Sequence, residues 1–330
     1  MRYRELILIR HLVMIFLMIM IFVSCRKEKN EWIPLKQFST GLDVRINDIS
    51  ILHPAHWFCC GGNRDESGFI AQSQDGGINW RQWSTDQESS VYCIGWIDSL
   101  KGFAGGDYLH LWRTFDGGQS WGYYWLGDQV PFNEEDRPAI RDFYFKNDTT
   151  WNFCGGENLG EGVYYETNNA GVDWSFKFYQ HEYRSICNAG DAVLVGGHGS
   201  IISFHGSISD EVNSTFENDF ITAIVQSNSG NLVAASFTGK IYSTSDQGQS
   251  WYEQASSGKV FRHSGAWTDA AAEDNHIVIV GTGGAIAESE DGGSSWSYHV
   301  LTDSADLYCV EMKDGIILAG SDNGIVFRLQ

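Results

Sequence analysis

Four arginines stand at related places in this sequence and could bind an anionic group. They are Arg45, Arg141, Arg184 and Arg262. Three of them align at the start of an apolar segment that reads as an innermost strand, and Arg45 lies close to the same register; other segments hold Ser90 or Asp306 at this place. Each guanidinium presents a planar fork of N–H donors that suits a carboxylate or a phosphate. We expect these side chains to gather on one face of the fold and to bind an acidic group of a partner.

Acidic residues near the arginines leave two alternatives open. Each arginine would instead pair with a neighbouring carboxylate, such as Asp142, Glu157 or Glu182. Alternatively, a pair of carboxylates drawn from Asp107, Glu157 and Asp322 would hydrolyse a glycosidic bond. The sequence has no Gly-rich phosphate loop, nucleophile elbow or metal-ligand motif. We therefore favour a binding role over an enzyme, and expect neither a cofactor nor a metal.

Further candidate contacts follow the Gly-rich ends of apolar segments. Asp107, Tyr108, Glu157 and His198 occupy such places, and a long loop over 125–137 contributes Trp125 and Phe132. Aromatic side chains dominate many contact energies, so these two would anchor a protein or a sugar. A solvated acidic loop is the alternative interpretation of the same segment.

The elements that must position these residues are set by a repeat. The pattern Ser/Thr-x-Asp-x-Gly-x-x-Trp occurs five times, once with Asn in place of Asp. Its glycines allow a tight turn with positive φ, its Asp accepts N–H bonds in the turn, and its Trp buries a large ring at the start of the next strand. The five pairs are Asp75 and Trp80, Asp116 and Trp121, Asn169 and Trp174, Asp246 and Trp251, and Asp291 and Trp296.

These five copies resemble the Asp-box (BNR) repeat of sialidases, sortilin-like receptors and the photosystem II assembly factor-like propellers. In those families the boxes lie on the rim away from the binding face, which implies a structural role here. The assembly factor-like propellers also have a basic patch of inner-strand arginines. The Phe-Arg-Ile-Pro segment of sialidases is matched only at its first two positions, by Phe261-Arg262.

The spacing of the repeat predicts the number of units. Successive box tryptophans are separated by 41, 53, 77 and 45 residues, so the longest gap contains a unit without a box. Seven apolar segments that end in small residues support the same count. We predict an all-β fold over 31–330: a single seven-bladed β-propeller of four-stranded antiparallel blades. Residues 31–38 would supply the strand that closes the last blade, with Trp32 in the place of a box Trp.

The amino terminus has the features of a secretory signal. Arg2, Arg4 and Arg10 precede an apolar run over 12–23. Phe22-Val23-Ser24-Cys25 resembles a bacterial lipobox, which implies a signal peptide over 1–24, lipidation of Cys25 and a tether over 25–30. The chain would then be anchored in the cell envelope, expected at the outer membrane and facing the periplasm or the exterior. An uncleaved anchor helix is the alternative, although the run is short of the roughly 20 residues that span a bilayer.

Charge and cysteine content limit the partners. With 22 Lys plus Arg against 42 Asp plus Glu, the chain is a poor partner for nucleic acid, and anionic membrane surfaces would repel it. Membrane attachment is therefore expected through the lipid only. Six further cysteines fall at core positions of the repeat, where we expect free thiols, with disulfides as the alternative. They are Cys59, Cys60, Cys93, Cys154, Cys187 and Cys309.

Taken together, these features predict a lipid-anchored envelope propeller. We expect it to bind a protein through the face opposite the boxes, as a scaffold or an assembly-type factor. A glycan-binding protein or a glycoside hydrolase of the sialidase-like propeller type is the alternative.

Overall fold

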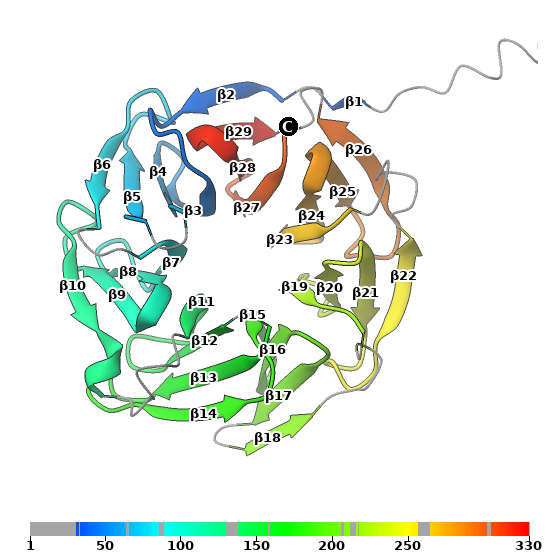
Figure 1. Ribbon diagram of the computed structural model, residues 1–330. Helices are drawn as coiled ribbons and strands as arrows, with labels where there is room; N and C mark the ends of the chain where they lie inside the picture. Colours follow the sequence, from blue (N-terminus) through cyan, green and yellow to red (C-terminus); the bar gives the residue numbers. More distant parts are fainter. Residues whose placement is uncertain are drawn as a thin grey trace, which may run out of the picture. The chain divides into compact units, whose positions relative to one another are not determined.

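The chain folds into β-strands joined by short turns (Figure 1). The computed structural model describes residues 31–32, 34–63, 66–85, 89–129, 138–157, 159–205, 208–211, 216, 218–256, 265–301 and 305–329. The predicted signal peptide, Cys25 and the tether lie outside these residues. In the described ranges no helix is both long enough and apolar enough to cross a bilayer.

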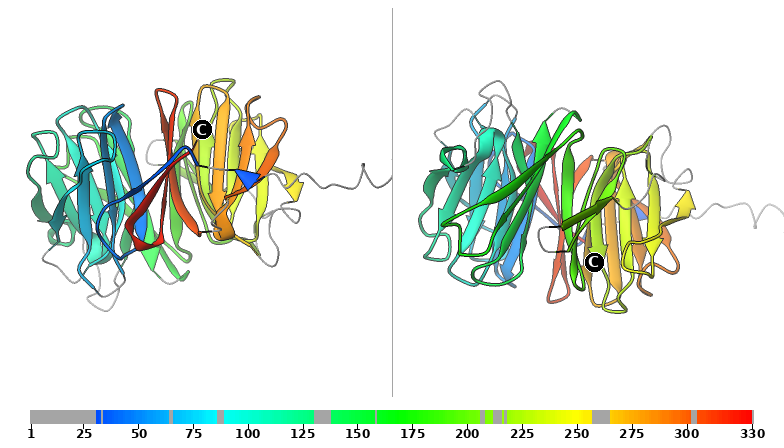
Figure 2. Two further views of the ribbon diagram at one scale, coloured as in Figure 1. Left: turned by 90° about the horizontal axis from the view of Figure 1, so that it is seen from above. Right: turned by 90° about the horizontal axis from the view of Figure 1, so that it is seen from below.

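Seven antiparallel sheets make up the compact unit Trp32–Gln330. They stand around a ring as blades, and their strands run roughly along its axis (Figures 1 and 2). The all-β, seven-bladed propeller with four-stranded antiparallel blades is thus confirmed.

The blades follow one another along the chain, and in the first six the innermost strand comes first. Blade 1 consists of β3 (Ile46–His53), β4 (His56–Gly61), β5 (Phe69–Ser73) and β6 (Arg81–Ser84). Blade 2 consists of β7 (Val91–Trp96), β8 (Gly102–Gly106), β9 (His110–Thr114) and β10 (Gly122–Trp125). Blade 3 consists of β11 (Ala139–Phe145), β12 (Trp151–Glu157), β13 (Glu161–Thr167) and β14 (Ser175–Tyr179).

The remaining blades keep the same order. Blade 4 consists of β15 (Tyr183–Ala189), β16 (Ala192–Gly197), β17 (Ile201–His205) and β18 (Ile208–Glu211). Blade 5 consists of β19 (Ile221–Gln226), β20 (Leu232–Ser236), β21 (Lys240–Thr244) and β22 (Tyr252–Ser256). Blade 6 consists of β23 (Trp267–Glu273), β24 (His276–Gly281), β25 (Ala285–Ser289) and β26 (Ser297–Leu301). Blade 7 consists of β27 (Leu307–Lys313), β28 (Ile316–Ser321), β29 (Ile325–Leu329) and β2 (Lys36–Ser39).

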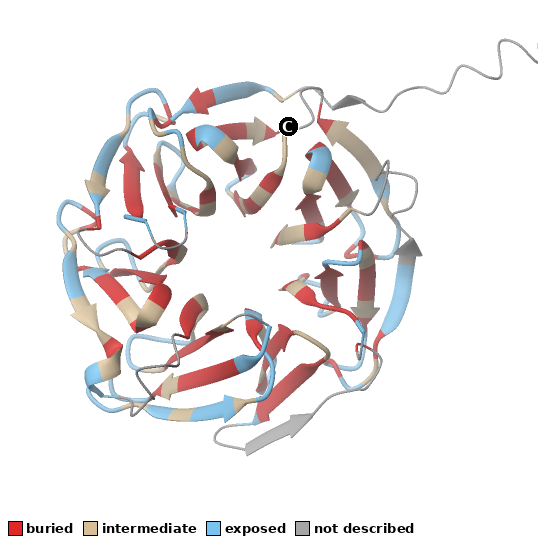
Figure 3. Cartoon of the chain, in the orientation of Figure 1, coloured by how far each residue is buried: buried red, intermediate tan, exposed pale blue. Residues whose placement is uncertain are grey.

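The core lies between the blades. The second and third strands of most blades are buried, whereas outer strands such as β10 and β14 are largely exposed or half-buried (Figure 3). Rings from neighbouring blades meet there: Phe58 of blade 1 packs 4.5 Å from Trp96 of blade 2, measured between ring centroids. Small residues on the inner strands allow this close approach, since a Cβ on Gly105 would meet Ile140 of blade 3 at 2.7 Å.

The N-terminal strand closes the ring. Strand β2 pairs antiparallel with β29, with Phe38 opposite Val326, which confirms the predicted closure. Trp32 was placed wrongly, however. It belongs to β1 (Glu31–Trp32), which is hydrogen-bonded to β26 of blade 6 rather than to blade 7. Only the four residues of β2 face β29, so the strand before them lies along the outer edge of the preceding blade.

The five repeat turns share one hydrogen-bonding scheme. In the first, the Ser73 hydroxyl donates to Asp75 Oδ1 (2.9 Å) and accepts from the Gly77 amide (2.8 Å). Asp75 Oδ1 also accepts from the Asn79 amide (2.8 Å), and Trp80 Nε1 donates to the Gly77 carbonyl (3.0 Å). The bonds around the hydroxyl and the carboxylate or amide recur in the other four turns. Hydrogen bonds, led by one from a serine hydroxyl, lower the pKa of Asp116, Asp246 and Asp291 to about 2.

The six cysteines that the structure describes are free thiols, as expected. Five are buried and Cys187 is half-buried. Burial raises the pKa of the Cys187 thiol to about 12, so it is protonated at neutral pH and behaves as part of the core.

A matched pair of glycines tests the turn geometry. Gly77 has φ +87°, and a Cβ there would meet Trp57 at 2.6 Å and Phe38 at 2.8 Å. Gly283 has φ +68° with nothing within 4 Å of a Cβ. We expect Gly283→Ala to cost about 1 kcal/mol for the left-handed backbone, and Gly77→Ala about 3 kcal/mol because overpacking is added. Chemical denaturation measures both; equal losses would contradict the packing role of Gly77.

Candidate functional site

A bulge interrupts every innermost strand at the same place. In β11, for example, Ile140 pairs with Gly155 and Asp142 with Cys154, so Arg141 is left out of the register. Each bulge leaves one residue unpaired. The seven unpaired residues are Asn47, Tyr92, Arg141, Arg184, Thr222, Thr268 and Tyr308. All seven line one cavity of about 440 Å³, together with Arg45.

Two arginines of this ring share one buried carboxylate. Glu182 Oε1 lies 2.9 Å from Nε of Arg141 and 3.3 Å from Nε of Arg184, and its other oxygen accepts from the Leu159 amide at 3.0 Å. The side chain of Glu182 is 1% exposed, against 14% for Arg141 and 40% for Arg184. Arg141 also stacks over the Tyr92 ring, with its Cζ 3.9 Å from the centroid.

The charges in this triad do not cancel. Burial would raise the pKa of Glu182, but the charges of Arg141 and Arg184 outweigh it and lower that pKa. Glu182 is therefore an anion between two cations, and the charge of Asp107 also acts on Arg141. Burial, followed by the Arg141 charge, lowers the pKa of Arg184. An added carboxylate beside Arg184 would relieve this repulsion.

Arg45, which directly precedes β3 of blade 1, adds a third guanidinium to the ring cavity. Its Nε donates to Asn47 Oδ1 at 2.6 Å, and its Cζ lies 4.9 Å above the centre of the Tyr308 ring. These contacts orient the guanidinium through neutral groups, so its charge is available to an anion in the cavity.

A second cavity, of about 750 Å³, adjoins the same two arginines. Its wall includes His198 and Phe220, and two exposed apolar side chains: Leu159, 46% exposed, and Phe237, 59% exposed. Arg141, Arg184 and Phe237 line both this cavity and the ring cavity, and Glu182 lines this one. The arrangement offers a cationic centre flanked by an apolar wall.

Three half-buried carboxyls line the ring cavity with the arginines. Asp48, Asp142 and Asp269 follow the bulge in blades 1, 3 and 6 and line the ring cavity. Each accepts an amide from its own strand and one from the next blade; Asp142, for example, accepts from Phe143 at 2.7 Å and Ile186 at 2.8 Å. Burial raises the pKa of Asp142 and Asp269 to about 7, and that of Asp48 well above its usual range.

The structure brings only some of the expected site residues together. Arg45, Arg141 and Arg184 meet in one cavity, and His198 joins the last two in the other. The alternative pairing of the arginines with Glu182 is also observed. Arg262 and Phe132 lie outside the described residues.

The predicted register of the arginines was wrong in the other blades. Thr268, not Arg262, occupies the matching place in blade 6, and Tyr92 and Tyr308 occupy it in blades 2 and 7, two residues after Ser90 and Asp306. The alignment began these innermost strands too early: they start at Val91, Leu307 and Trp267, after the residues that were matched to Arg141 and Arg184.

The remaining candidates lie outside the two cavities. Asp107 is buried and accepts from the Ser90 amide at 3.3 Å and the Tyr92 hydroxyl at 3.2 Å. Trp125 Nε1 donates to the Tyr108 carbonyl at 2.8 Å, which fixes the turn that contains Tyr108. Glu157 ends β12 and pairs with Glu161 in the ladder. These contacts hold the loops around the site.

Sequence reasoning missed the neutral members of the ring and the apolar wall. Tyr92, Tyr308 and Phe237 carry no charge pattern that would single them out. The available signal was positional: in six of the seven innermost strands the unpaired residue follows the first buried residue, as Tyr92 follows Val91, and in β11 it follows the second.

Known proteins with similar sequences or structures can now be compared. No family model matches the sequence. Photosystem II assembly lipoprotein Ycf48 from Synechococcus sp. (strain CC9902) is 25% identical over 286 residues, which are 83% of this chain and 81% of that protein. The chain is similar to Ycf48.

Solved structures agree on the fold. YCF48 bound to D1 peptide aligns with a TM-score of 0.69 at 19% identity, over 92% of this chain and 96% of that one. Virginiamycin B lyase from Staphylococcus aureus aligns with a TM-score of 0.68 at 11% identity, over 89% and 98%. A binding protein and a lyase thus share this propeller, so the fold alone does not decide between binding and catalysis.

Removing the shared carboxylate tests the triad. Glu182→Gln would leave Arg141 and Arg184 facing each other without an anion, and we expect a loss of about 3 kcal/mol in the free energy of unfolding. Glu253→Gln, which breaks the exposed pair with Lys240, is the control and should cost under about 1 kcal/mol. Urea denaturation compares the two. Similar losses would show that Glu182 does not hold the arginines.

The buried carboxyls predict a pH dependence. With a folded pKa of about 7, Asp142 stays protonated in the folded chain while the unfolded chain ionises above about pH 4. Stability is therefore lost as the pH rises toward 7, by about 2 kcal/mol between pH 5 and pH 7. Asp142→Asn should flatten this slope, whereas Asn at the exposed Asp43 should not. Unfolding curves at pH 5 and pH 7 measure this change. If Asp142→Asn loses as much stability as the wild type between the two pH values, Asp142 is not its source.

Proposed function

We propose that this chain is a lipid-anchored protein of the cell envelope that holds a partner protein by an acidic group, as a scaffold or an assembly-type factor. The observation that carries the proposal is the sharing of one carboxylate, Glu182, by Arg141 and Arg184 at the junction of two cavities. The two guanidinium groups favour an anion, and Arg184, whose side chain is 40% exposed, suits a carboxylate of the partner.

The apolar wall favours a peptide over a small inorganic anion. Leu159 and Phe237 are exposed beside the arginines, where they would pack against side chains that flank the bound carboxylate. The likeness to Ycf48 also supports a protein partner. One similar structure is YCF48 bound to D1 peptide, and the Synechococcus relative is a photosystem II assembly lipoprotein. We extend to this chain the binding of a protein, not the identity of that partner.

The remaining parts of the chain serve this role. We propose that the five repeat turns are Asp boxes that stiffen the outer hairpins. We also propose that residues 1–24 are removed, that Cys25 carries the lipid, and that residues 26–30 separate the propeller from the outer membrane. The Synechococcus relative is a lipoprotein, which supports the proposed lipid anchor.

The test compares arginine variants in partner capture. Detergent-solubilised envelope is passed over immobilised wild-type protein, Arg184→Ala, and Arg81→Ala as a control that removes equal charge from β6. Captured proteins are then titrated as purified components. We expect Arg184→Ala to weaken binding by about 30-fold, equivalent to about 2 kcal/mol, because it breaks a charged pair, while Arg81→Ala binds normally.

Equal binding by Arg184→Ala and wild type, with the fold intact by circular dichroism, would overturn the proposal. If no protein is captured and a glycan array gives binding instead, the glycan-binding alternative replaces it. Release of sugar from a bound glycan would indicate a hydrolase.

A further inference from the structure

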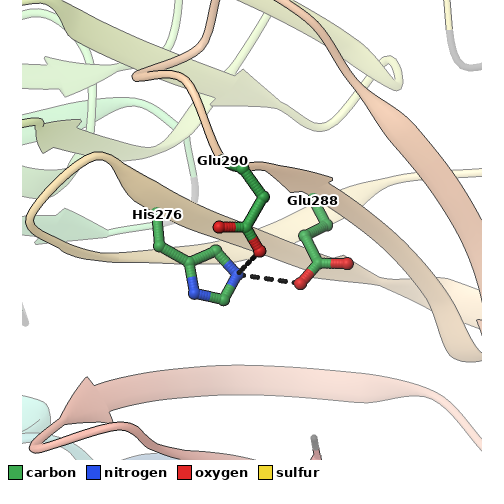
Figure 4. Close-up of side chains that lie close together, drawn as sticks. All are labelled: His276, Glu288 and Glu290. Atoms are coloured by element: carbon green, nitrogen blue, oxygen red, sulfur yellow. Dashed lines mark hydrogen bonds and ion pairs between the residues drawn. The ribbon is translucent and has the colours of Figure 1, made fainter.

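A second group of polar side chains gathers on blade 6, away from the arginines. His276 begins β24, Glu288 lies on β25, Glu290 follows in the turn, and His299 lies on β26 (Figure 4 shows the first three). His276 Nε2 lies 2.8 Å from Glu288 Oε1 and 3.6 Å from Glu290 Oε1. One ligand atom from each of these three residues lies within 4.8 Å of the other two.

Strand pairing brings the residues to one face of the sheet. Glu288 is opposite Val278, and His299 is opposite Ile286, so the charged groups continue the face that packs toward blade 7. His276, Glu288 and His299 are half-buried and only Glu290 is exposed. The sheet therefore holds His276, Glu288 and His299, and the turn after β25 carries Glu290.

The charge of the group is incompletely balanced. Among the described residues, the ion pairs of Glu288 and Glu290 are with histidines and not with Lys or Arg. An imidazole is neutral over much of the physiological range. A divalent cation would neutralise both carboxylates and accept the lone pair of His276 Nε2.

Blade 1 shows the same geometry without the ligands. Gln72 is opposite Phe58 as Glu288 is opposite Val278, and Trp83 is opposite Ile70 as His299 is opposite Ile286. His56 begins β4 as His276 begins β24, and its Nε2 lies 2.5 Å from Gln72 Nε2. In blade 1 the repeat therefore forms this contact between a histidine and an amide, as a structural feature. Of the two blades, only blade 6 has carboxylates at this place.

We propose that His276, Glu288 and Glu290 bind one Zn²⁺ ion. Imidazole nitrogen and carboxylate oxygen are ordinary zinc ligands at about 2.0 to 2.2 Å, and water would complete a four-coordinate site. Mg²⁺ and Ca²⁺ prefer oxygen ligands alone, so the histidine selects against them. His299 Nε2 lies 3.5 Å from the second oxygen of Glu288, where it orients that carboxylate.

The expected absence of a metal rested on the lack of ligands at fixed short spacings in the sequence. His276 and Glu288 are instead brought together by a hairpin, and their spacing in sequence gives no zinc signature.

Calorimetric titration of ZnCl₂ into the full-length, tag-free protein, after removal of metal with EDTA, tests the proposal. We expect one ion per chain, and no heat with MgCl₂. His276→Ala and Glu288→Gln should each weaken Zn²⁺ binding by about 10-fold or more. His56→Ala in blade 1 is the matched control and should bind as the wild type does.

Thermal melting checks that each variant is folded and gives a second readout, since Zn²⁺ should raise the Tm of the wild type and of His56→Ala but not of His276→Ala. Absence of a one-ion site in the wild type, or equal affinity in His276→Ala, would overturn the proposal. Loss of binding in His56→Ala with retention in Glu288→Gln would also overturn it. The arginine site is not involved, so Arg184→Ala should bind Zn²⁺ normally.

Discussion

A bulge at a fixed place in each innermost strand is the feature on which the centre of this propeller depends. The bulge turns one side chain into the cavity and directs the next toward the neighbouring blade. In four of the seven blades that next residue accepts a backbone amide from the following blade, at Asp48, Asp142, Ser185 and Asp269. The bulge thus places one side chain in the cavity and the next in a contact between blades. The side chain in the cavity can therefore vary while the contact between blades is kept.

The carboxyls in this centre differ in what surrounds them. Asp142 and Asp269 are half-buried among backbone amides and apolar strands, and burial raises their pKa to about 7. Glu182 is buried more deeply but faces two guanidinium groups, whose charges lower its pKa. Because Asp142 and Asp269 are partly protonated at pH 7, they add less negative charge beside Arg141 and Arg184 than two ionised carboxylates would.

Much of the architecture could be read from the sequence because it is local and repeated. The turn motif, its Trp and the small residues of the inner strands predicted the number of blades, and Glu182 was one of three carboxylates expected in the alternative pairing of the arginines. The rest depended on pairing. The arginine register failed in blades 2, 6 and 7 because their innermost strands begin later than the alignment assumed. Trp32 joined blade 6 because only a four-residue strand closes blade 7. His276 and Glu288 meet only through a hairpin, which no sequence spacing reveals.

The symmetry of the scaffold explains why the site lies off its axis. Positions that face the core keep apolar residues in every blade, whereas the ring positions hold three neutral types in five blades and arginine in two adjacent ones, blades 3 and 4. The second cavity, with Leu159 and Phe237, extends from these arginines over blades 3 to 5 and not across the ring. A partner that satisfied both the charge and the apolar wall would therefore lie over that sector. A symmetric ligand on the axis would meet the arginines on one side only.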